Sequence, residues 1–282
     1  DLNRLCNRAE TRLVTILGPA GIGKTRLALE VAQSLADETT ETAAPDNPKS
    51  KILNPKFKDG LFFVSLAPIT VAEHIVPAIA EAIHFQFQAD GQAPKEQLLD
   101  YLAQKQLLLV LDNCEHLLDG VGLIHALLQA APALRILTTS RERLHLTSET
   151  VFTLDSMDFP TWETPQEALA YSAVQLFVTT AQRVDPGFSV DSANVQYVAR
   201  ICRLVGGMPL GIILAAAWIE VLSAQEIAAE LTHGFDLLTV EYRDLPARQR
   251  SMRAVLAYSW QSFAAALLVW WWRPWRVLRC PS

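Results

Sequence analysis

The sequence has few cysteines, and no segment in it resembles a secretory signal. Its 282 residues include four cysteines, Cys6, Cys114, Cys202 and Cys280, which lie far apart and form no Cys-x-x-Cys pair. Such spacing is typical of ordinary reduced thiols, and it predicts a cytoplasmic protein. The first residue is not a methionine, so we expect the chain to begin inside a longer product or to have been trimmed.

Positive charge and long apolar runs are scarce too. The chain carries 24 Lys and Arg against 30 Asp and Glu, a net charge of -6, which argues against a dedicated nucleic-acid surface and leaves room only for a local basic patch. The cluster of Arg248, Arg250 and Arg253 is interpreted as a solvated helix face. The apolar stretch 210–222 is interrupted by Glu220 and is short for a bilayer, so it predicts a buried core helix and no membrane association.

What is present indicates a globular α/β protein. Half of the residues are hydrophobic and 19% are charged. Strands alternate with helices over the first part, which predicts a parallel sheet with both faces covered. The strands are expected at 13–17, 61–66, 107–111, 135–140 and 151–154. After residue 165 only helices are expected, at 173–183, 192–205 with Ser192 as its cap, 210–222, 223–231 with the Ser223–Glu226 capping box, and 248–260.

The apolar strand 13–17 leads into a glycine-rich loop of the form G-x-x-x-x-G-K-T. Its residues are Gly18, Pro19, Ala20, Gly21, Ile22, Gly23, Lys24 and Thr25. Glycines let backbone amides approach a phosphate closely, and the helix that follows adds its free N–H groups. In this pattern Lys24 reaches the β- and γ-phosphates, and the Thr25 hydroxyl binds Mg²⁺. We therefore predict a site for a nucleoside triphosphate or diphosphate; the alternative is a glycine-rich turn that matches by coincidence.

Asp112 follows the apolar strand 107–111, where a P-loop protein places the carboxylate that organises Mg²⁺ opposite Thr25. The alternative is an acidic residue that starts a turn. Many ATPases carry a second carboxylate directly after this aspartate, but here the residue is Asn113, which favours slow turnover and hence a switch. Glu115 is the nearest side chain that could orient a water, unless it is a solvated turn residue.

Arg141 follows the strand expected at 135–140. A guanidinium there could pair with a γ-phosphate and so report its presence. The alternative is a surface arginine paired with Glu142 or with the helix after Asp112. With these alternatives open, we assign Lys24, Asp112, Glu115 and Arg141 to catalysis.

In their order these motifs resemble the STAND class of P-loop ATPases, close to the NB-ARC domains of apoptotic and plant disease-resistance switches. The resemblance is closest to a bacterial branch found in large transcriptional and signalling regulators. The matching segments are 12–29, 109–117, 137–144, 207–210 with a Gly-x-Pro motif, and 244–250 as a linker into a winged-helix subdomain.

The resemblance implies several properties. The sheet order would be 5-1-4-3-2, which places Arg141 beside the phosphate loop as a γ-phosphate sensor. Pro209 would lie against the adenine from a helical lid, and Arg26 would also belong to the nucleotide site. The resting state would hold ADP, and exchange for ATP would open the lid and drive self-association of the full-length protein.

Four domains are expected on this basis: a P-loop nucleotide-binding domain at 1–157, a helical lid at 158–240, the start of a truncated winged-helix subdomain at 241–262, and an atypical tail at 263–282. The tail has four tryptophans within six residues, beside arginines, which departs from the family pattern. A frameshifted or truncated end is the preferred explanation, and a membrane-interface anchor is the alternative.

The expected function is an ATP/ADP-binding regulatory switch that couples nucleotide exchange and slow hydrolysis to signalling or transcriptional control. A P-loop enzyme with continuous turnover is one alternative, and Asn113 argues against it. A truncated remnant that only binds nucleotide is the other. DNA binding by this segment has little support in the sequence.

Overall fold

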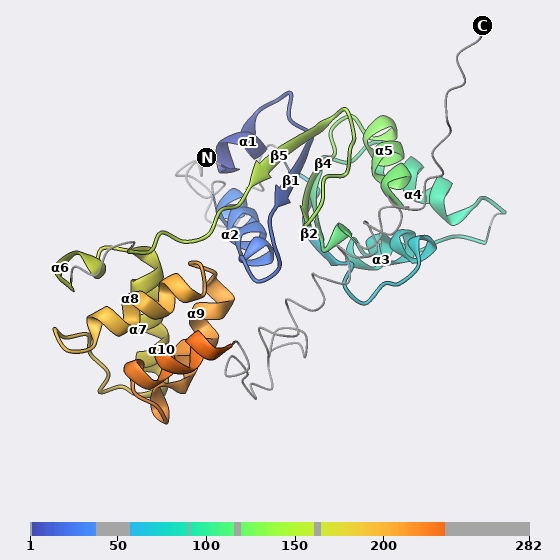
Figure 1. Ribbon diagram of the computed structural model, residues 1–282. Helices are drawn as coiled ribbons and strands as arrows, with labels where there is room; N and C mark the ends of the chain where they lie inside the picture. The colour runs from blue at the N-terminus through green and yellow to red at the C-terminus, as the bar shows by residue number, and fades with distance from the viewer. Residues whose placement is uncertain (1, 38–56, 90, 116–119, 161–164, 235–282) are drawn as a thin grey trace, which may run out of the picture. The chain divides into compact units, whose positions relative to one another are not determined.

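The computed structural model describes residues 2–37, 57–89, 91–115, 120–160 and 165–234 (Figure 1). The chain divides into two compact units, Asp1–Gly18 with Gly23–Leu154, and Pro19–Ile22 with Asp155–Ser282. The first is an α/β unit and the second is helical. The expected winged-helix start, the helix at 248–260, the arginine cluster and the tail lie outside the described residues.

The first unit contains a five-stranded parallel sheet. Its strands are β1 (Leu13–Leu17), β2 (Gly60–Ser65), β3 (Leu107–Asp112), β4 (Arg135–Ser140) and β5 (Glu149–Thr153). They lie in the order β2-β3-β4-β1-β5, and every pairing is parallel. This is the expected order 5-1-4-3-2 read from the other edge, so the fold prediction is confirmed. The strand ends differ from the expected ones by one or two residues at most.

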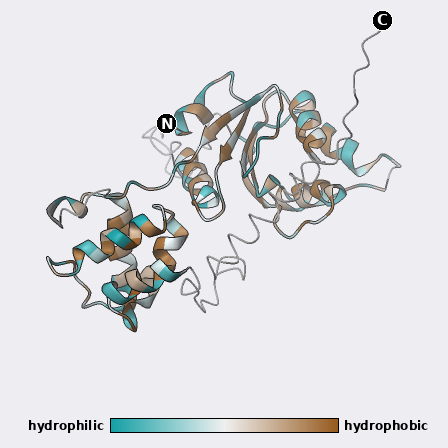
Figure 2. Ribbon diagram, viewed as in Figure 1, coloured by the Kyte–Doolittle hydropathy of each residue, from teal (hydrophilic) through white to brown (hydrophobic). Residues whose placement is uncertain are grey.

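Both faces of the sheet are covered, as the apolar continuity of β3 predicts. Leu107, Leu109 and Leu111 pack into one core cluster, whereas Leu108 and Val110 pack into another. Figure 2 shows the strands as mainly hydrophobic. The helices of this unit are α1 (Leu2–Asn7), α2 (Lys24–Asp37), α3 (Ile75–Ala82), α4 (Pro94–Leu102) and α5 (Val121–Ala130), with a 3-10 turn η2 (Ala72–His74). Helices α3, α4 and α5 contribute to the first cluster, and α1 and α2 to the second.

The second unit is built from short helices around the buried Phe177. They are α6 (Pro165–Ala168), α7 (Ser172–Val184), α8 (Val195–Leu204), α9 (Pro209–Ala216), the 3-10 turn η4 (Ala217–Glu220) and α10 (Ala224–His233). The capping box that was expected before α10 is confirmed: the Glu226 N–H donates to the Ser223 hydroxyl at 3.3 Å, and the Ser223 N–H donates to the Glu226 carboxylate at 2.8 Å. In the described part of the chain no helix has the length and hydropathy of a membrane span.

Two expectations for this unit were wrong. Ser192 does not cap α8, because the neighbouring Asp191 carboxylate accepts the N–H groups of Ala193 and Asn194 at 2.9 Å each and holds the chain in a turn. The apolar stretch 210–222 is not one helix, since α9 ends at Ala216 and η4 follows it. The apolar run predicted burial, which holds for most of α9 but for no residue of η4, and its periodicity does not reveal a change of helix type.

Gly207, in the turn between α8 and α9, contacts the segment around Met157 at the start of the second unit. The Met157 N–H donates to the Gly207 carbonyl at 3.0 Å. Gly207 has a φ of 65°, and an added Cβ would overlap the Met157 carbonyl and stand 2.7 Å from Cδ1 of Phe159. The preceding Gly206 has a similar φ of 61°, with no atom within 4 Å of the position of a Cβ. Of these two positions, Gly207 therefore requires glycine for steric reasons as well as for its backbone conformation, whereas Gly206 requires it for its conformation alone.

We expect Gly207→Ala to lower the stability of the second unit by more than about 2 kcal/mol, because it adds a steric clash to the left-handed strain of about 1–3 kcal/mol. Gly206→Ala is the matched control, since it carries the strain alone. Urea unfolding of both variants followed by circular dichroism measures the difference. Equal losses in the two variants would show that the contact with Met157 is unimportant.

Candidate functional site

The glycine-rich loop joins β1 to α2 as the sequence predicts. Gly21 and Gly23 have φ values of 79° and 100°, in the left-handed region that favours glycine. The Gly18 N–H donates to the Ser140 carbonyl at 3.3 Å, which extends the β1–β4 pairing by one residue. Helix α2 begins directly after the loop, at Lys24. The loop therefore ends on a helix N-terminus, the arrangement that exposes N–H groups to an anion.

The Lys24 side chain bends back over the glycine-rich loop. Its Nζ donates to the Gly18 carbonyl at 2.8 Å. Burial is the largest influence on its pKa, which falls from 10.5 to about 8; the Glu115 carboxylate opposes this shift, Arg141 adds to it, and Asp112 opposes it. Lys24 thus shares one electrostatic neighbourhood with three other residues predicted for the site.

Asp112 is the meeting point of three segments. Its Oδ1 accepts hydrogen bonds from the Thr25 hydroxyl at 2.7 Å and from the Thr139 hydroxyl at 2.6 Å. The Thr139 hydroxyl in turn accepts the Asn113 N–H at 2.9 Å. Asp112 is 5% exposed and Thr139 1% exposed, so both groups are shielded from water. Thr25 and Asp112, the two residues that the sequence assigns to Mg²⁺, are therefore in direct contact, and Thr139 is an additional partner of Asp112.

Thr139 belongs to the candidate site by its hydrogen bonds, although the sequence reasoning did not assign it. Strands β3 and β4 are neighbours, with Leu111 opposite Thr138, so Asp112 and Thr139 stand next to each other at the end of their strands. A hydroxyl at that place orients the carboxylate and satisfies the backbone after it. The signal that could have revealed it is the sheet order, combined with a polar residue beside the strand-end aspartate.

The donor set at this place suits Mg²⁺. Thr25 and Asp112 offer a hydroxyl and a carboxylate, and hard oxygen ligands are those that Mg²⁺ prefers. The described residues hold no group of three or more His, Cys, Asp or Glu side chains that could bind a metal by themselves. Mg²⁺ commonly takes one or two protein oxygens and completes its octahedron with phosphates and waters. Thr25 and Asp112 fit that pattern.

Arg141 and Glu115 form an ion pair, with 3.0 Å between Nε and Oε1. Their side chains are 14% and 5% exposed, so neither is the solvated surface group that the sequence left open. The alternative left open for Arg141 was a surface arginine paired with Glu142 or with the helix after Asp112. The contact agrees with the second partner segment, although Arg141 is largely shielded from solvent. The assignment of Glu115 to orienting a water stays a prediction.

The remaining predicted residues are spread over both units. Arg26 is an exposed residue in the first turn of α2, and Ile22 is buried. Pro209 is the first residue of α9. Within the second unit, the Leu210 N–H donates to the Gly21 carbonyl at 3.2 Å. A contact of Pro209 or Arg26 with a nucleotide stays a prediction.

The buried cysteines are not part of this chemistry. Cys6, Cys114 and Cys202 are buried and form no disulfide among the described residues, as expected from their spacing. Burial, with smaller contributions from Glu115 and Asp112, raises the pKa of the Cys114 thiol, and burial raises that of Cys202 to about 12. Both side chains therefore stay protonated and behave as small core residues.

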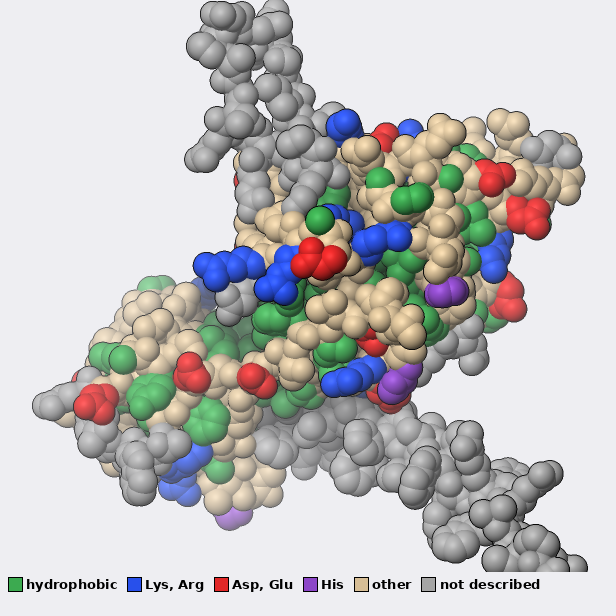
Figure 3. All heavy atoms as spheres, turned by 90° about the horizontal axis from the view of Figure 1, so that it is seen from above, with side chains coloured by type: hydrophobic (Ala, Val, Ile, Leu, Met, Phe, Trp, Pro, Cys, Tyr) green, Lys and Arg blue, Asp and Glu red, His purple; other side chains and the backbone are tan. Residues whose placement is uncertain are grey.

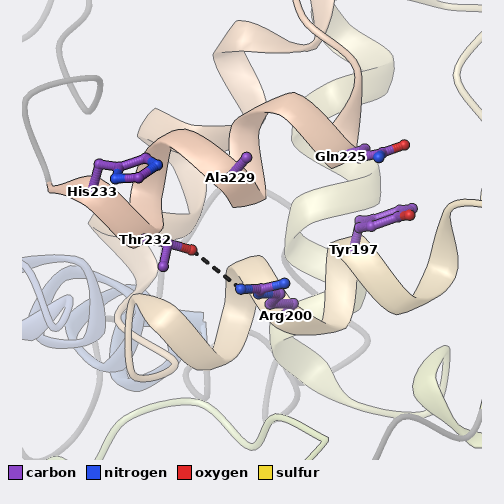
Figure 4. Close-up of a pocket in the computed structure, with 6 residues that line it drawn as sticks. All are labelled: Tyr197, Arg200, Gln225, Ala229, Thr232 and His233. Atoms are coloured by element: carbon purple, nitrogen blue, oxygen red, sulfur yellow. Dashed lines mark hydrogen bonds between the residues drawn. The ribbon is translucent and has the colours of Figure 1, made fainter.

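A separate hollow of about 430 Å³ lies in the second unit, on the surface between α8 and α10 (Figure 4). The Arg200 guanidinium crosses it and donates to the Thr232 hydroxyl at 3.3 Å. The other lining residues are Tyr197, Gln225, Ala229 and His233. None of the residues predicted to bind nucleotide lines this hollow.

On the face seen in Figure 3, basic and acidic side chains both occur, with apolar and uncharged ones between them. The described residues on this face therefore form no continuous surface of one charge. That distribution agrees with the low positive charge of the sequence, and the absence of nucleic-acid binding by this segment stays a prediction.

Residues 7–152 match the family described as AAA domain. A Mycobacterium tuberculosis protein whose name marks it as a candidate HTH-type transcriptional regulator is 36% identical over 252 residues, which cover 89% of this chain and 25% of that protein. An uncharacterised protein of the same species is 35% identical over 239 residues, covering 84% of this chain and 53% of its own length. The chain thus spans between a quarter and about half of the lengths of these relatives.

Two solved structures are more distantly similar. The ADP form of the Aeropyrum pernix ORC2 protein gives a TM-score of 0.48 at 14% identity and covers 82% of this chain and 65% of that one. A STAND protein with a tetratricopeptide repeat sensor, from Pyrococcus horikoshii, gives a TM-score of 0.43 at 16% identity and covers 83% and 32%.

We expect Thr139→Val to weaken the Mg²⁺-dependent part of nucleotide affinity by about tenfold or more, because the Asp112 carboxylate loses the hydroxyl that orients it. Thr138→Val is the matched control, since it deletes a buried hydroxyl one residue away that donates to Thr15 at 2.9 Å. Both changes should lower stability by about 1–3 kcal/mol. Titration of a fluorescent nucleotide with and without Mg²⁺ separates the two effects. An unchanged Mg²⁺ dependence in Thr139→Val would contradict the role given to this hydroxyl.

Proposed function

Because the chain belongs to the AAA-domain family, we propose that it binds ATP and ADP with Mg²⁺ and acts as a regulatory switch of the STAND class, close to the NB-ARC domains. Proteins of this family are P-loop ATPases that generally bind ATP or ADP with Mg²⁺. The observation that carries the proposal is the hydrogen bond from Thr25, at the start of α2, to Asp112, at the end of β3. It joins the end of a phosphate-type loop to the carboxylate that such a site requires for its metal.

Each group has a distinct part in this proposal. The amides of Gly18–Thr25 and the N-terminus of α2 bind the phosphates. Lys24 would exchange the Gly18 carbonyl for phosphate oxygens, because a charged partner holds an ammonium group more strongly than a neutral one does. Thr25 and Asp112 would hold Mg²⁺, which neutralises negative charge on the β- and γ-phosphates. Pro209 and Arg26 are proposed to contact the nucleotide, as in the resembling family.

One observation favours a switch over an enzyme with continuous turnover. The residue after Asp112 is Asn113, which cannot act as a carboxylate base. Slow hydrolysis follows, and a long-lived nucleotide state is what a switch needs.

Transcriptional control is the output that the relatives suggest. One of them is named as a candidate HTH-type transcriptional regulator, and the matched region is a quarter of its length. The proposal is therefore that this chain is the nucleotide-dependent part of a longer cytoplasmic regulator. In that protein, exchange of ADP for ATP would open the helical unit and promote self-association.

We expect the purified chain to carry tightly bound ADP and to hydrolyse ATP at less than about 0.01 per second, in the range of unassisted nucleotide switches. Nucleotide released by heat and separated by ion-exchange chromatography identifies the ligand. A coupled phosphate-release assay gives the turnover. Several turnovers per second would exclude the switch and favour an enzyme.

Lys24→Ala should lower the affinity for both nucleotides by about 10- to 100-fold, the usual effect of losing a hydrogen bond to a charged group. Lys95→Ala is its control, because Lys95 is an exposed lysine in the first turn of α4. If wild type and Lys24→Ala both fail to bind any nucleotide, the proposed function is wrong.

Arg141→Ala should weaken ATP binding by about 10- to 100-fold while changing ADP binding little, because only ATP offers a γ-phosphate to the guanidinium. Arg143→Ala, an exposed arginine two residues further on, is the control. Isothermal titration with each nucleotide gives the two affinities. An equal loss for ATP and ADP would show that Arg141 is no γ-phosphate sensor.

A further inference from the structure

The Glu115 carboxylate, which forms an ion pair with Arg141, is shielded from solvent and lacks well-aligned hydrogen bonds. Nε and Oε1 are 3.0 Å apart, yet neither Glu115 oxygen accepts a well-aligned hydrogen bond from the described residues, and both are shielded from solvent. A buried carboxylate in this condition has lost its water without regaining equivalent partners. Such a pair is held mainly by the attraction of its charges, so an anion with better geometry can replace the carboxylate.

The pair stands next to the loop that would hold the phosphates. The Ser140 carbonyl, one residue before Arg141, accepts the Gly18 N–H at 3.3 Å. The Gly18 carbonyl accepts from Lys24 at 2.8 Å. Glu115 and Arg141 are also two of the charged groups that influence the pKa of Lys24. The backbone before Arg141 therefore contacts the start of the loop, and the charges of Glu115 and Arg141 act on Lys24.

We propose that Glu115 is an internal competitor of the γ-phosphate for Arg141, and that it thereby sets the preference of the site for ADP over ATP. The inference rests on the proposed function, because it requires nucleotide at the glycine-rich loop. The contact that carries it is the 3.0 Å approach of a buried carboxylate to the proposed sensor arginine.

The competition acts on one nucleotide only. ADP ends at its β-phosphate and leaves Arg141 on Glu115. ATP adds a group with up to two negative charges and three acceptor oxygens, which can bind a guanidinium through two parallel hydrogen bonds. Arg141 must leave Glu115 to make those bonds, so the loss of the ion pair subtracts from the affinity for ATP and not from that for ADP. A residue that penalises one of two states shifts the equilibrium between them.

Glu115→Gln tests the proposal, because the amide keeps the shape of the side chain and removes its charge. We expect the ratio of ATP affinity to ADP affinity to rise about tenfold in this variant. Glu142→Gln is the matched control: it removes the same charge from an exposed neighbour of Arg141 and should leave the ratio unchanged. Both dissociation constants are measured on the full 282-residue chain by isothermal titration after nucleotide removal.

A double-mutant cycle shows whether the effect passes through the arginine. In the Arg141→Ala background, Glu115→Gln should leave the ratio as it is, because there is no guanidinium to release. A rise that persists without Arg141 overturns the proposal, as does an equal change of both affinities in Glu115→Gln. Should Glu115→Gln fail to fold, Glu115→Asp serves, since it withdraws the carboxylate from Arg141; a smaller rise supports the proposal, and no rise overturns it.

The failure of the inference can be distinguished from failure of the proposed function. Suppose that Lys24→Ala loses nucleotide binding while Glu115→Gln leaves the ratio of ATP affinity to ADP affinity unaltered. The proposed function is then supported, and the role of Glu115 as a competitor is wrong. Absence of binding by the wild-type chain removes both.

Discussion

The site depends on one carboxylate oxygen that receives two hydroxyl groups. Oδ1 of Asp112 accepts from Thr25 and from Thr139, which belong to the start of α2 and the end of β4. These segments are far apart in the sequence and meet because β3, β4 and β1 are consecutive in the sheet. Because the carboxylate is nearly excluded from water, its two hydrogen bonds must be retained, or a cation or another donor must take their place. The loop, the proposed Mg²⁺ position and the strand ends are thereby coupled.

The sheet could be predicted from the sequence because its strands are short, continuous apolar runs between polar segments. Such runs identify strands that are buried on both faces, and β4 was located to the residue. The apolar runs could not predict the order of the strands, because hydrophobicity does not indicate which strands are neighbours in the sheet. It came from the resemblance to a family and from the motifs that carry it.

The partners of the site side chains were harder to foresee. Thr139 was visible as a strand residue, but its hydrogen bonds to Asp112 and Asn113 depend on the alignment of β3 with β4. The pairing of Glu115 with Arg141 was not foreseen beyond the general alternative of a contact with the helix after Asp112, because charge and spacing alone do not distinguish a buried partner from a solvated neighbour. Ser192 failed as a cap since a stronger acceptor, Asp191, stands beside it.

Asn113 has a consequence for any attempt to turn the domain into a faster ATPase. Its φ is 73°, a left-handed conformation that asparagine tolerates better than most residues with a side chain. A glutamate at this position would therefore supply the carboxylate that hydrolytic relatives of the P-loop class carry, and would also strain the backbone directly after Asp112. To relieve that strain the chain would have to turn differently, which would disturb the Asn113 N–H bond to Thr139. The gain of a carboxylate base would thus be opposed by the loss of the hydrogen bond through which Thr139 supports the segment after Asp112. Under the proposed function, the rate of hydrolysis would then be limited by the conformation of the main chain as well as by side-chain chemistry.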